Sequence, residues 1–254
     1  MIDTHSHIYD EAYAEDFEQV IQRAKESGVD KVILPGIDSQ SYTAMMDCAE
    51  KLCGYAIPAI GLHPTSVGKD YHNELQFVWD HFETGSFCAI GEIGLDEYWS
   101  KDCLFEQIQV FQEQLYFAWE QDLPVIIHAR EATEDIFTCL SKVGKPLRGT
   151  FHAYCGSYET YLRIKKKWPG FKIGVGGVVT YKNSHLAAFL DKVDINDIVL
   201  ETDAPWLTPV PFRGKRNESS YVKYVAMKIA ELKDMSFAEV NDITTNNAVQ
   251  LFAL

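Results

Sequence analysis

Two histidines separated by one residue, His5 and His7, lie in the opening stretch MIDTHSH. Side chains alternate between the two faces of a β-strand, so residues two apart project to the same side. Two imidazoles on one side offer a pair of nitrogen ligands for a divalent cation. The alternative is a frayed terminus whose histidines face water. Further ligands elsewhere in the chain are needed to decide between these interpretations.

Four other potential metal ligands stand at or just after the ends of short apolar runs: Glu92, His128, His152 and Asp203. Taken singly, a histidine at a strand end is more often a hydrogen-bonded core residue, and an aspartate there can cap a helix. Together with the histidine pair they supply six borderline or hard metal ligands from five strand ends. We therefore favour a metal site over six unrelated structural roles.

The elements that must position these residues alternate along the chain. Eight short, β-rich apolar runs lie at 1–7, 31–37, 55–63, 87–96, 124–130, 149–154, 172–179 and 197–205. Segments with helical periodicity lie at 14–28, 39–53, 70–83, 103–121, 131–143, 157–168, 184–193, 219–232 and 236–252. Apolar strands separated by helices indicate parallel pairing. Eight such units predict an α/β fold of the (β/α)8 TIM-barrel type, whose carboxyl strand ends share one mouth; an open doubly wound sheet is the alternative.

The composition is that of an ordinary globular protein, with 46% hydrophobic and 24% charged residues among 254. No Pro-, Gly- or Ser-rich linker divides the chain, so we expect one domain over 1–254. There is no apolar run of about 18 residues and no secretory signal. Six widely spaced cysteines without a C-x-x-C pair are typical of reduced thiols. These features predict a cytoplasmic protein with no membrane partner; the oligomeric state stays open, and a monomer is compatible with the sequence.

The formal net charge of −14 argues against broad, nonspecific attraction to nucleic acid, because counterion release needs a basic surface. It leaves room for a local cationic site. Arg213, Lys215 and Arg216 stand close together in the loop 209–220, shortly after Asp203. We expect this loop to cover a substrate that carries a phosphate.

Four histidines and two carboxylates exceed the needs of one tetrahedral ion, so two divalent ions that share a bridging carboxylate are the economical arrangement. We predict Glu92 as the bridge. The first ion is assigned His5, His7, Glu92 and Asp203, and the second Glu92, His128 and His152. Paired ions without thiolate ligands suit hydrolysis, with Asp203 accepting a proton from the attacking water. The residues alone do not distinguish a phosphate ester from an amide.

The ligands stand within an ordered set of motifs. These are DTHSH at 3–7, GLHP at 61–64, GEIGLD at 91–96, IHAR at 127–130, ETDAPWL at 201–207, RGKRNE at 213–218 and TNNAVQLF at 245–252. On this set the chain resembles the TatD family of metal-dependent deoxyribonucleases, within the amidohydrolase-like barrel superfamily, nearly from end to end. The resemblance implies a binuclear site with the ligands assigned above and cleavage of DNA phosphodiesters, commonly as an exonuclease. Zn²⁺, Mn²⁺ and Mg²⁺ all suit such ligands.

The resemblance also implies substrate contacts. His63 is expected to meet the substrate phosphate, although a turn residue before Pro64 is the plainer interpretation. Arg130 follows a predicted ligand by two positions, and its guanidinium suits a phosphate; an ion pair with Glu131 or Glu134 is the alternative. Because the surface is acidic, we expect single-stranded DNA or 3′ ends as the partner, since only a local cationic rim then meets the strand.

Three further residues belong to these motifs. Asp96 and Glu201 are expected to orient histidines or a substrate, because a metal-bound imidazole needs an acceptor for its other N–H. Trp206 follows Asp203 by three positions and is our first candidate for stacking on a base, although most rim aromatics pack against loops.

Two other functions stay open. An amidohydrolase, lactonase or esterase acting on a small molecule would use the same metals. Such enzymes often bridge their ions with a carboxylated lysine, whereas Glu92 takes that place here. A metal-stabilised interaction module is disfavoured, because closed structural zinc sites usually include cysteine.

Overall fold

The computed structural model describes residues 1–99 and 101–254, and strands and helices alternate along most of the chain. The strands are β1 (Ile2–Asp3), β2 (Lys31–Leu34), β3 (Ala56–Pro58), β4 (Ile90–Asp96), β5 (Val125–Arg130), β6 (Gly149–Phe151), β7 (Phe171–Val175) and β8 (Ile198–Leu200). The α-helices are α1 (Phe17–Glu26), α2 (Ser39–Lys51), α3 (Tyr71–Phe82), α4 (Leu104–Glu120), α5 (Thr133–Val143), α6 (Tyr158–Lys167), α7 (Val222–Lys233) and α8 (Phe237–Phe252).

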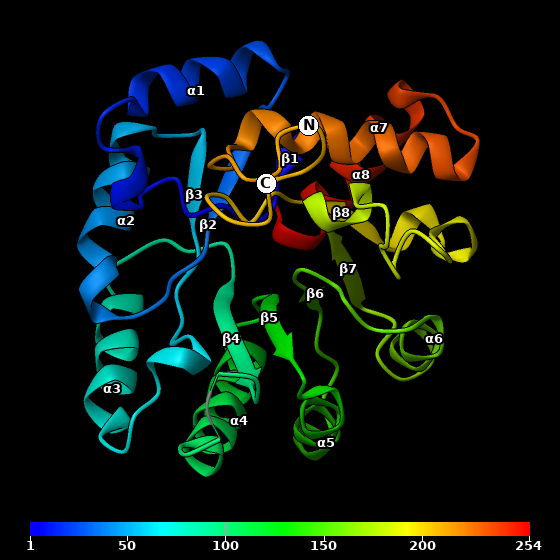
Figure 1. Cartoon of the computed structure of the whole chain (residues 1–254). Helices are drawn as coiled ribbons and strands as arrows, with labels where there is room; N and C mark the ends of the chain where they lie inside the picture. The colour runs from blue at the N-terminus through cyan, green and yellow to red at the C-terminus, as the bar shows by residue number, and fades with distance from the viewer. Residues whose placement is uncertain (100) are drawn as a thin grey trace.

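The strands close into a parallel barrel. Regular ladders run in the orders β1-β2-β3 and β4-β5-β6-β7-β8. Single parallel bridges, Ser6 with Ala204 and Ile60 with Ile90, join the two ladders. Figure 1 shows the strands in the centre, with α1 to α7 around them. The predicted (β/α)8 barrel is therefore confirmed, with shorter strands than the apolar runs suggested.

The last helix closes one end of the barrel. Residues from β1, β2, β5 and β8 form a buried cluster with α8: Ile2, Ile33, Ile126, Val199, Ala248, Leu251 and Phe252. Asn247 in α8 donates from Nδ2 to the Ile198 carbonyl over 2.8 Å, which fixes the helix against β8. Because Ile2 and Ile198 lie at the starts of their strands, α8 covers the amino ends and leaves the carboxyl ends for the site.

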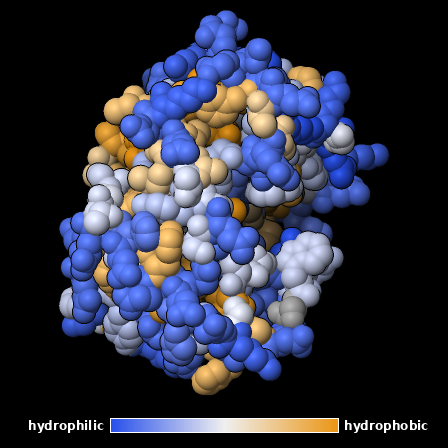
Figure 2. All heavy atoms as spheres, turned by 90° about the vertical axis from the view of Figure 1, so that its left-hand side faces the viewer, coloured by the Kyte–Doolittle hydropathy of each residue, from blue (hydrophilic) through white to orange (hydrophobic). Residues whose placement is uncertain are grey.

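The outer helices are amphipathic. In α1, for example, Val20, Ile21 and Ala24 are buried whereas the opposite face is polar. Figure 2 shows the face over α2 and α3, where hydrophilic residues cover most of the surface and hydrophobic residues surface between them. Among the described residues, no helix combines the length and apolarity needed to cross a bilayer.

The predicted helix at 184–193 is wrong. Its one regular piece in the described chain is the short 3-10 turn Leu190–Lys192. The Ser184 hydroxyl accepts the N–H of Ala187 over 3.2 Å, and such side-chain bonds compete with helical ones. Lys233 of α7 then donates to three backbone carbonyls of the segment. Tertiary contacts thus satisfy backbone groups that a helix would have paired.

Candidate metal centre

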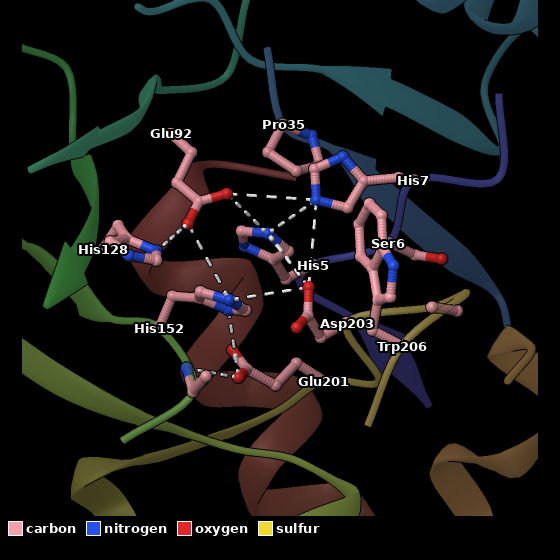
Figure 3. Close-up of polar contacts among 12 residues, drawn as sticks. His5, Ser6, His7, Pro35, Glu92, His128, His152, Glu201, Asp203 and Trp206 are labelled. Carbon is pink, nitrogen blue, oxygen red and sulfur yellow. Dashed lines mark hydrogen bonds and ion pairs between the residues drawn. The ribbon is translucent and has the colours of Figure 1, made fainter. Parts of the chain in front are cut away.

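The two histidines of the H-x-H motif follow β1 and meet the loop after β8. The His7 N–H donates to the Ala204 carbonyl over 2.8 Å, and the Asp203 N–H donates to the His5 carbonyl over 2.9 Å. Both imidazoles are buried. As the spacing predicted, they project to the same side, with their Nε2 atoms 3.2 Å apart (Figure 3).

Glu92 is a buried carboxylate in β4, at the point where the register with β5 shifts. Its Oε2 lies 3.1 Å from His5 Nε2 and 3.9 Å from His7 Nε2. Its Oε1 lies 2.9 Å from His128 Nδ1 and 3.4 Å from His63 Nε2. Burial opposes ionisation, but the surrounding histidines, His5 first, hold the pKa of Glu92 well below its usual value. Each oxygen of this anion faces its own group of imidazoles, as a bridging ligand requires.

Asp203 adds a second carboxylate from the loop after β8. Its Oδ1 lies 3.8 Å from Nε2 of both His5 and His7 and 3.6 Å from His152 Nε2. Burial raises the pKa of Asp203 to about 7, and burial lowers the pKa of the three histidines. At neutral pH these imidazoles are uncharged, so their nitrogen lone pairs are available to a metal.

Among the residues that the structure describes, the side chains that could hold a metal form three groups, each with ligand atoms within 4.8 Å of one another. The groups are His5, His7 and Glu92; His5, His152 and Asp203; and His63, Glu92 and His128. All six predicted ligands occur among them. The grouping differs from the predicted division, because His152 lies with His5 and Asp203, and His63 lies with Glu92 and His128. Which residues share an ion stays a prediction.

The hydrogen bonds of His7 fit a metal ligand. The Tyr9 hydroxyl donates to the Pro35 carbonyl over 2.5 Å, so its oxygen accepts the proton on His7 Nδ1, 2.8 Å away. Neutral His7 therefore has its lone pair on Nε2, facing His5 and Glu92 (Figure 3). Converging lone pairs favour a cation between them, so this donor set fits a divalent ion. Sequence reasoning missed Tyr9, although its spacing from His7 indicates the same side.

His128 lies between two carboxylates. Its Nε2 is 2.9 Å from Asp96 Oδ2, and its Nδ1 is 2.9 Å from Glu92 Oε1. Burial alone would lower the pKa of His128, but the bonds to these carboxylates outweigh it and raise the pKa to about 9. The other oxygen of Asp96 accepts the N–H groups of Tyr98 and Trp99. Asp96 thus lies where an orienting residue for His128 was expected.

Glu201 holds the corresponding place beside His152. Its Oε1 lies 3.1 Å from His152 Nδ1 and accepts the Ala153 N–H over 2.6 Å. The carboxylate fits against Gly174, where an added Cβ would lie 2.1 Å from Oε2. Burial raises the pKa of Glu201 to about 7. Figure 3 shows this side chain below His152, away from Glu92.

His63 caps a short turn and also faces the metal ligands. Its Nδ1 accepts the N–H of Thr65 over 3.1 Å, so the proton of the neutral ring is on Nε2. That Nε2 lies 3.4 Å from both His128 Nδ1 and Glu92 Oε1. In this tautomer His63 is a hydrogen-bond donor rather than a metal ligand, which suits the predicted contact with a substrate oxygen. The alternative role as a turn residue is fulfilled at the same time.

Arg130 emerges at the end of β5 and lies over aromatic rings. Its guanidinium carbon is 4.1 Å from the centre of the Tyr98 ring and 5.3 Å from that of Trp99. Among the described residues it has no ion-pair partner; Glu134, one predicted alternative partner, pairs with Arg163 instead. The Tyr98 and Trp99 side chains are 51% and 68% exposed. Arg130 therefore presents an uncompensated cation beside two accessible aromatic rings.

Trp206 lies at the mouth beside His7. The two rings meet edge to face with centroids 5.1 Å apart (Figure 3), and the indole is 48% exposed. Its backbone is held by Asn217, whose Nδ2 donates to the Trp206 carbonyl over 2.6 Å and to the Thr202 carbonyl over 2.8 Å. The loop thus carries an accessible ring on a fixed backbone.

The three cations of this loop have separate environments. Arg216 binds Asp16 over 2.7 Å and donates to the Ala12 carbonyl over 2.6 Å, so it is already paired. Arg213 lies over the Tyr181 ring, 4.2 Å from its centre. Lys215 lies 5.9 Å from the centre of the Phe212 ring. That this loop covers a phosphate-bearing substrate stays a prediction; of its three cations, Arg216 is the one that a carboxylate pairs with in the described chain.

Comparison with known proteins identifies a family and several relatives. The family described as "TatD related DNase" matches residues 2–253. An uncharacterized metal-dependent hydrolase of Bacillus subtilis, YabD, is 41% identical over the whole chain and 99% of its own length.

Solved structures of TatD proteins superpose on this chain. The crystal structure of YjjV, a TatD homologue from Escherichia coli, superposes with a TM-score of 0.92 and 30% identity, over 100% of this chain and 98% of that one. A TatD-family hydrolase from Entamoeba histolytica superposes with a TM-score of 0.84 over 99% and 97% of the two chains. At 21% identity, the second likeness supports the fold alone.

Proposed function

The chain belongs to the TatD related DNase family and is a metal-dependent hydrolase, and from that premise we propose that it cleaves DNA phosphodiester bonds at a binuclear metal site. The observation that carries the proposal is the position of Glu92, whose two oxygens face separate groups of imidazoles. Two divalent ions, of Zn²⁺, Mn²⁺ or Mg²⁺, fit these nitrogen and oxygen donors.

We assign the ligands as His5, His7, Glu92, His128, His152 and Asp203. Divalent ions held by these residues would activate a water molecule for attack and polarise a phosphoryl oxygen. Asp203, whose Oδ1 lies within 4 Å of the Nε2 atoms of His5, His7 and His152, accepts the proton of the attacking water.

Substrate contacts follow from the same geometry. His63 presents an Nε2–H beside Glu92 and donates to a phosphate oxygen. Arg130 supplies a cation that no described carboxylate neutralises, and Trp206 supplies an exposed ring next to His7. An anionic strand with unstacked bases matches cations beside aromatic rings. We therefore propose single-stranded DNA, entered from an end, as the substrate, with cleavage proceeding as an exonuclease.

The test compares substrate classes in one preparation. The purified protein is incubated with Mg²⁺ or Mn²⁺ and labelled single-stranded DNA, beside a panel of lactones and dipeptides. We expect DNA cleavage, its loss in Glu92→Gln, and full activity in Glu113→Gln, an exposed residue of α4. Hydrolysis of a lactone or dipeptide with intact DNA would favour the small-molecule alternative. DNA cleavage that persists in Glu92→Gln would overturn the site assignment.

A further inference from the structure

A cavity of about 420 Å³ is lined by residues that follow β6, β7 and β8, at the carboxyl ends of these strands. Its wall includes Ala153, which directly follows His152 and donates to Glu201, and Leu207, four residues after Asp203. Two predicted ligands, His152 and Asp203, thus stand in the same loops as residues of the cavity wall. Its volume lies in the range of small-ligand sites, roughly 300–1,000 Å³.

The lining combines flat apolar surfaces with cations. Tyr154 and Tyr181 contribute aromatic rings, and Leu186 and Leu207 contribute aliphatic surface. The hydroxyls of the two tyrosines are engaged with the carbonyls of Ser157 and Thr208, which orients the rings. A planar heterocycle is a fitting occupant for such walls, because bases stack on aromatic side chains.

Two cations at this cavity, Lys182 and Arg213, have no carboxylate partner among the residues that the structure describes. Arg213 rests on the Tyr181 ring, 4.2 Å from its centre, and both side chains are exposed. In a chain with a net charge of −14, unpaired cations beside an apolar cavity mark a place for an anion. We therefore expect the occupant of this cavity to combine a planar ring with an anionic group.

We infer that this cavity is a subsite for one nucleotide, which holds the base between the tyrosines and the phosphate at Lys182 and Arg213. The inference rests on the proposed function and extends it, because two predicted ligands stand in the same loops as residues of the cavity wall. The cavity then selects the terminal nucleotide of a strand and binds the mononucleotide that hydrolysis releases.

The test measures binding of dTMP, thymidine and inorganic phosphate to the purified full-length protein by calorimetry. We expect dTMP to bind at least about tenfold more tightly than either part, because charge-assisted bonds and stacking act together. The double variant Lys182→Ala/Arg213→Ala should lose about tenfold in dTMP affinity. Lys145→Ala/Lys166→Ala removes the same charge elsewhere and should bind like the wild type. Equal affinity for dTMP and phosphate, or unchanged dTMP binding in the first double variant, would overturn the inference.

Alkylation of cysteine provides an independent measurement. Cys155 is exposed at the cavity, whereas Cys53 is exposed after α2 and does not line it. We expect dTMP to slow the alkylation of Cys155 and to leave that of Cys53 unchanged; equal rates at Cys155 with and without dTMP would contradict the subsite. Both measurements report binding rather than cleavage, so failure of the subsite can be distinguished from failure of the proposed function. Protected Cys155 without DNA cleavage rejects the proposed function, and DNA cleavage without protection rejects the subsite.

Discussion

The Nδ1–H of His7 donates to the Tyr9 hydroxyl over 2.8 Å, and this bond determines which nitrogen of His7 faces the metal centre. The Tyr9 hydroxyl donates its one proton to the Pro35 carbonyl. In the bond between His7 and Tyr9, His7 Nδ1 is therefore the donor and the Tyr9 oxygen is the acceptor. A residue outside the predicted motif roles therefore sets the tautomer of a predicted ligand.

Replacing Tyr9 by Phe should weaken metal binding by about 10-fold to 100-fold, the usual effect of removing a partner of a metal-bound histidine. The measurement is metal affinity by calorimetry, with the fold checked by circular dichroism. Tyr55→Phe is the matched control, because the Tyr55 hydroxyl is buried without a hydrogen-bond partner among the described residues. Equal metal affinity in both variants would show that Tyr9 does not orient His7.

Gly174→Ala should destabilise the protein and reduce its activity. The new Cβ would lie 2.1 Å from Glu201 Oε2, so the carboxylate beside His152 has to move. Overpacking of this kind costs about 1–3 kcal/mol. The measurements are the free energy of unfolding in urea and hydrolytic activity. For stability, Gly176→Ala is the comparison, since the nearest atoms to its Cβ would lie 3.7 Å away; equal stability of the two variants would contradict the close fit.

Metal affinity should rise steeply with pH around neutrality. Burial raises the pKa of Asp203 to about 7, and carboxylate contacts overcome burial to raise that of His128 to about 9. Protons bound to these groups compete with a metal, so binding releases them. Calorimetry below and above pH 7 should show weaker binding at the lower pH. Asp203→Asn should bind less tightly and show a shallower pH dependence; an unchanged slope would exclude Asp203 as the titrating ligand.

Asp3 should make the metal-free protein less stable as pH rises. Its carboxylate is buried and accepts the N–H and hydroxyl of Thr202 over 2.9 and 2.7 Å, yet burial dominates and raises its pKa from 3.8 to about 7. Since the folded-state pKa is the higher one, the contribution of Asp3 to stability is complete below about pH 4 and is lost as pH rises through about 7.

Urea unfolding of the chelator-treated protein across this interval measures the effect. Asp3→Asn cannot ionise and should flatten the decline, whereas Asp47→Asn, at an exposed position of α2, should follow the wild type. A wild-type profile in Asp3→Asn would assign the pH dependence to other groups.

Much of the candidate site was predictable because parallel strands bring their carboxyl ends together. His5, Glu92, His128, His152 and Asp203 are separated by up to 198 residues, yet alternation of apolar strands and helices indicated a common mouth. The H-x-H spacing likewise predicted that His5 and His7 share a side, and the bonds to Asp203 and Ala204 preserve that geometry.

Other features depend on contacts that no local pattern reveals. The segment 184–193 has helical periodicity, but Lys233 binds its carbonyls and the Ser184 hydroxyl takes a backbone N–H. Arg216 stands next to the site in sequence, but Asp16 from an early segment binds it. In both cases a residue that is distant in the sequence supplies the contact, Lys233 for the segment 184–193 and Asp16 for Arg216. Such tertiary contacts outweigh the weak intrinsic preference of a segment for a helix.

The sequence by itself determined the barrel through the periodicity of its apolar runs, and the family resemblance through its ordered motifs. It also determined the set of residues able to bind metal, through side-chain chemistry. Only the tertiary structure decided which imidazole nitrogen faces which carboxylate, which cations stay unpaired and where a cavity lies at the carboxyl ends of the strands. Those properties depend on distances of a few ångströms between residues far apart in the chain, and packing alone sets such distances.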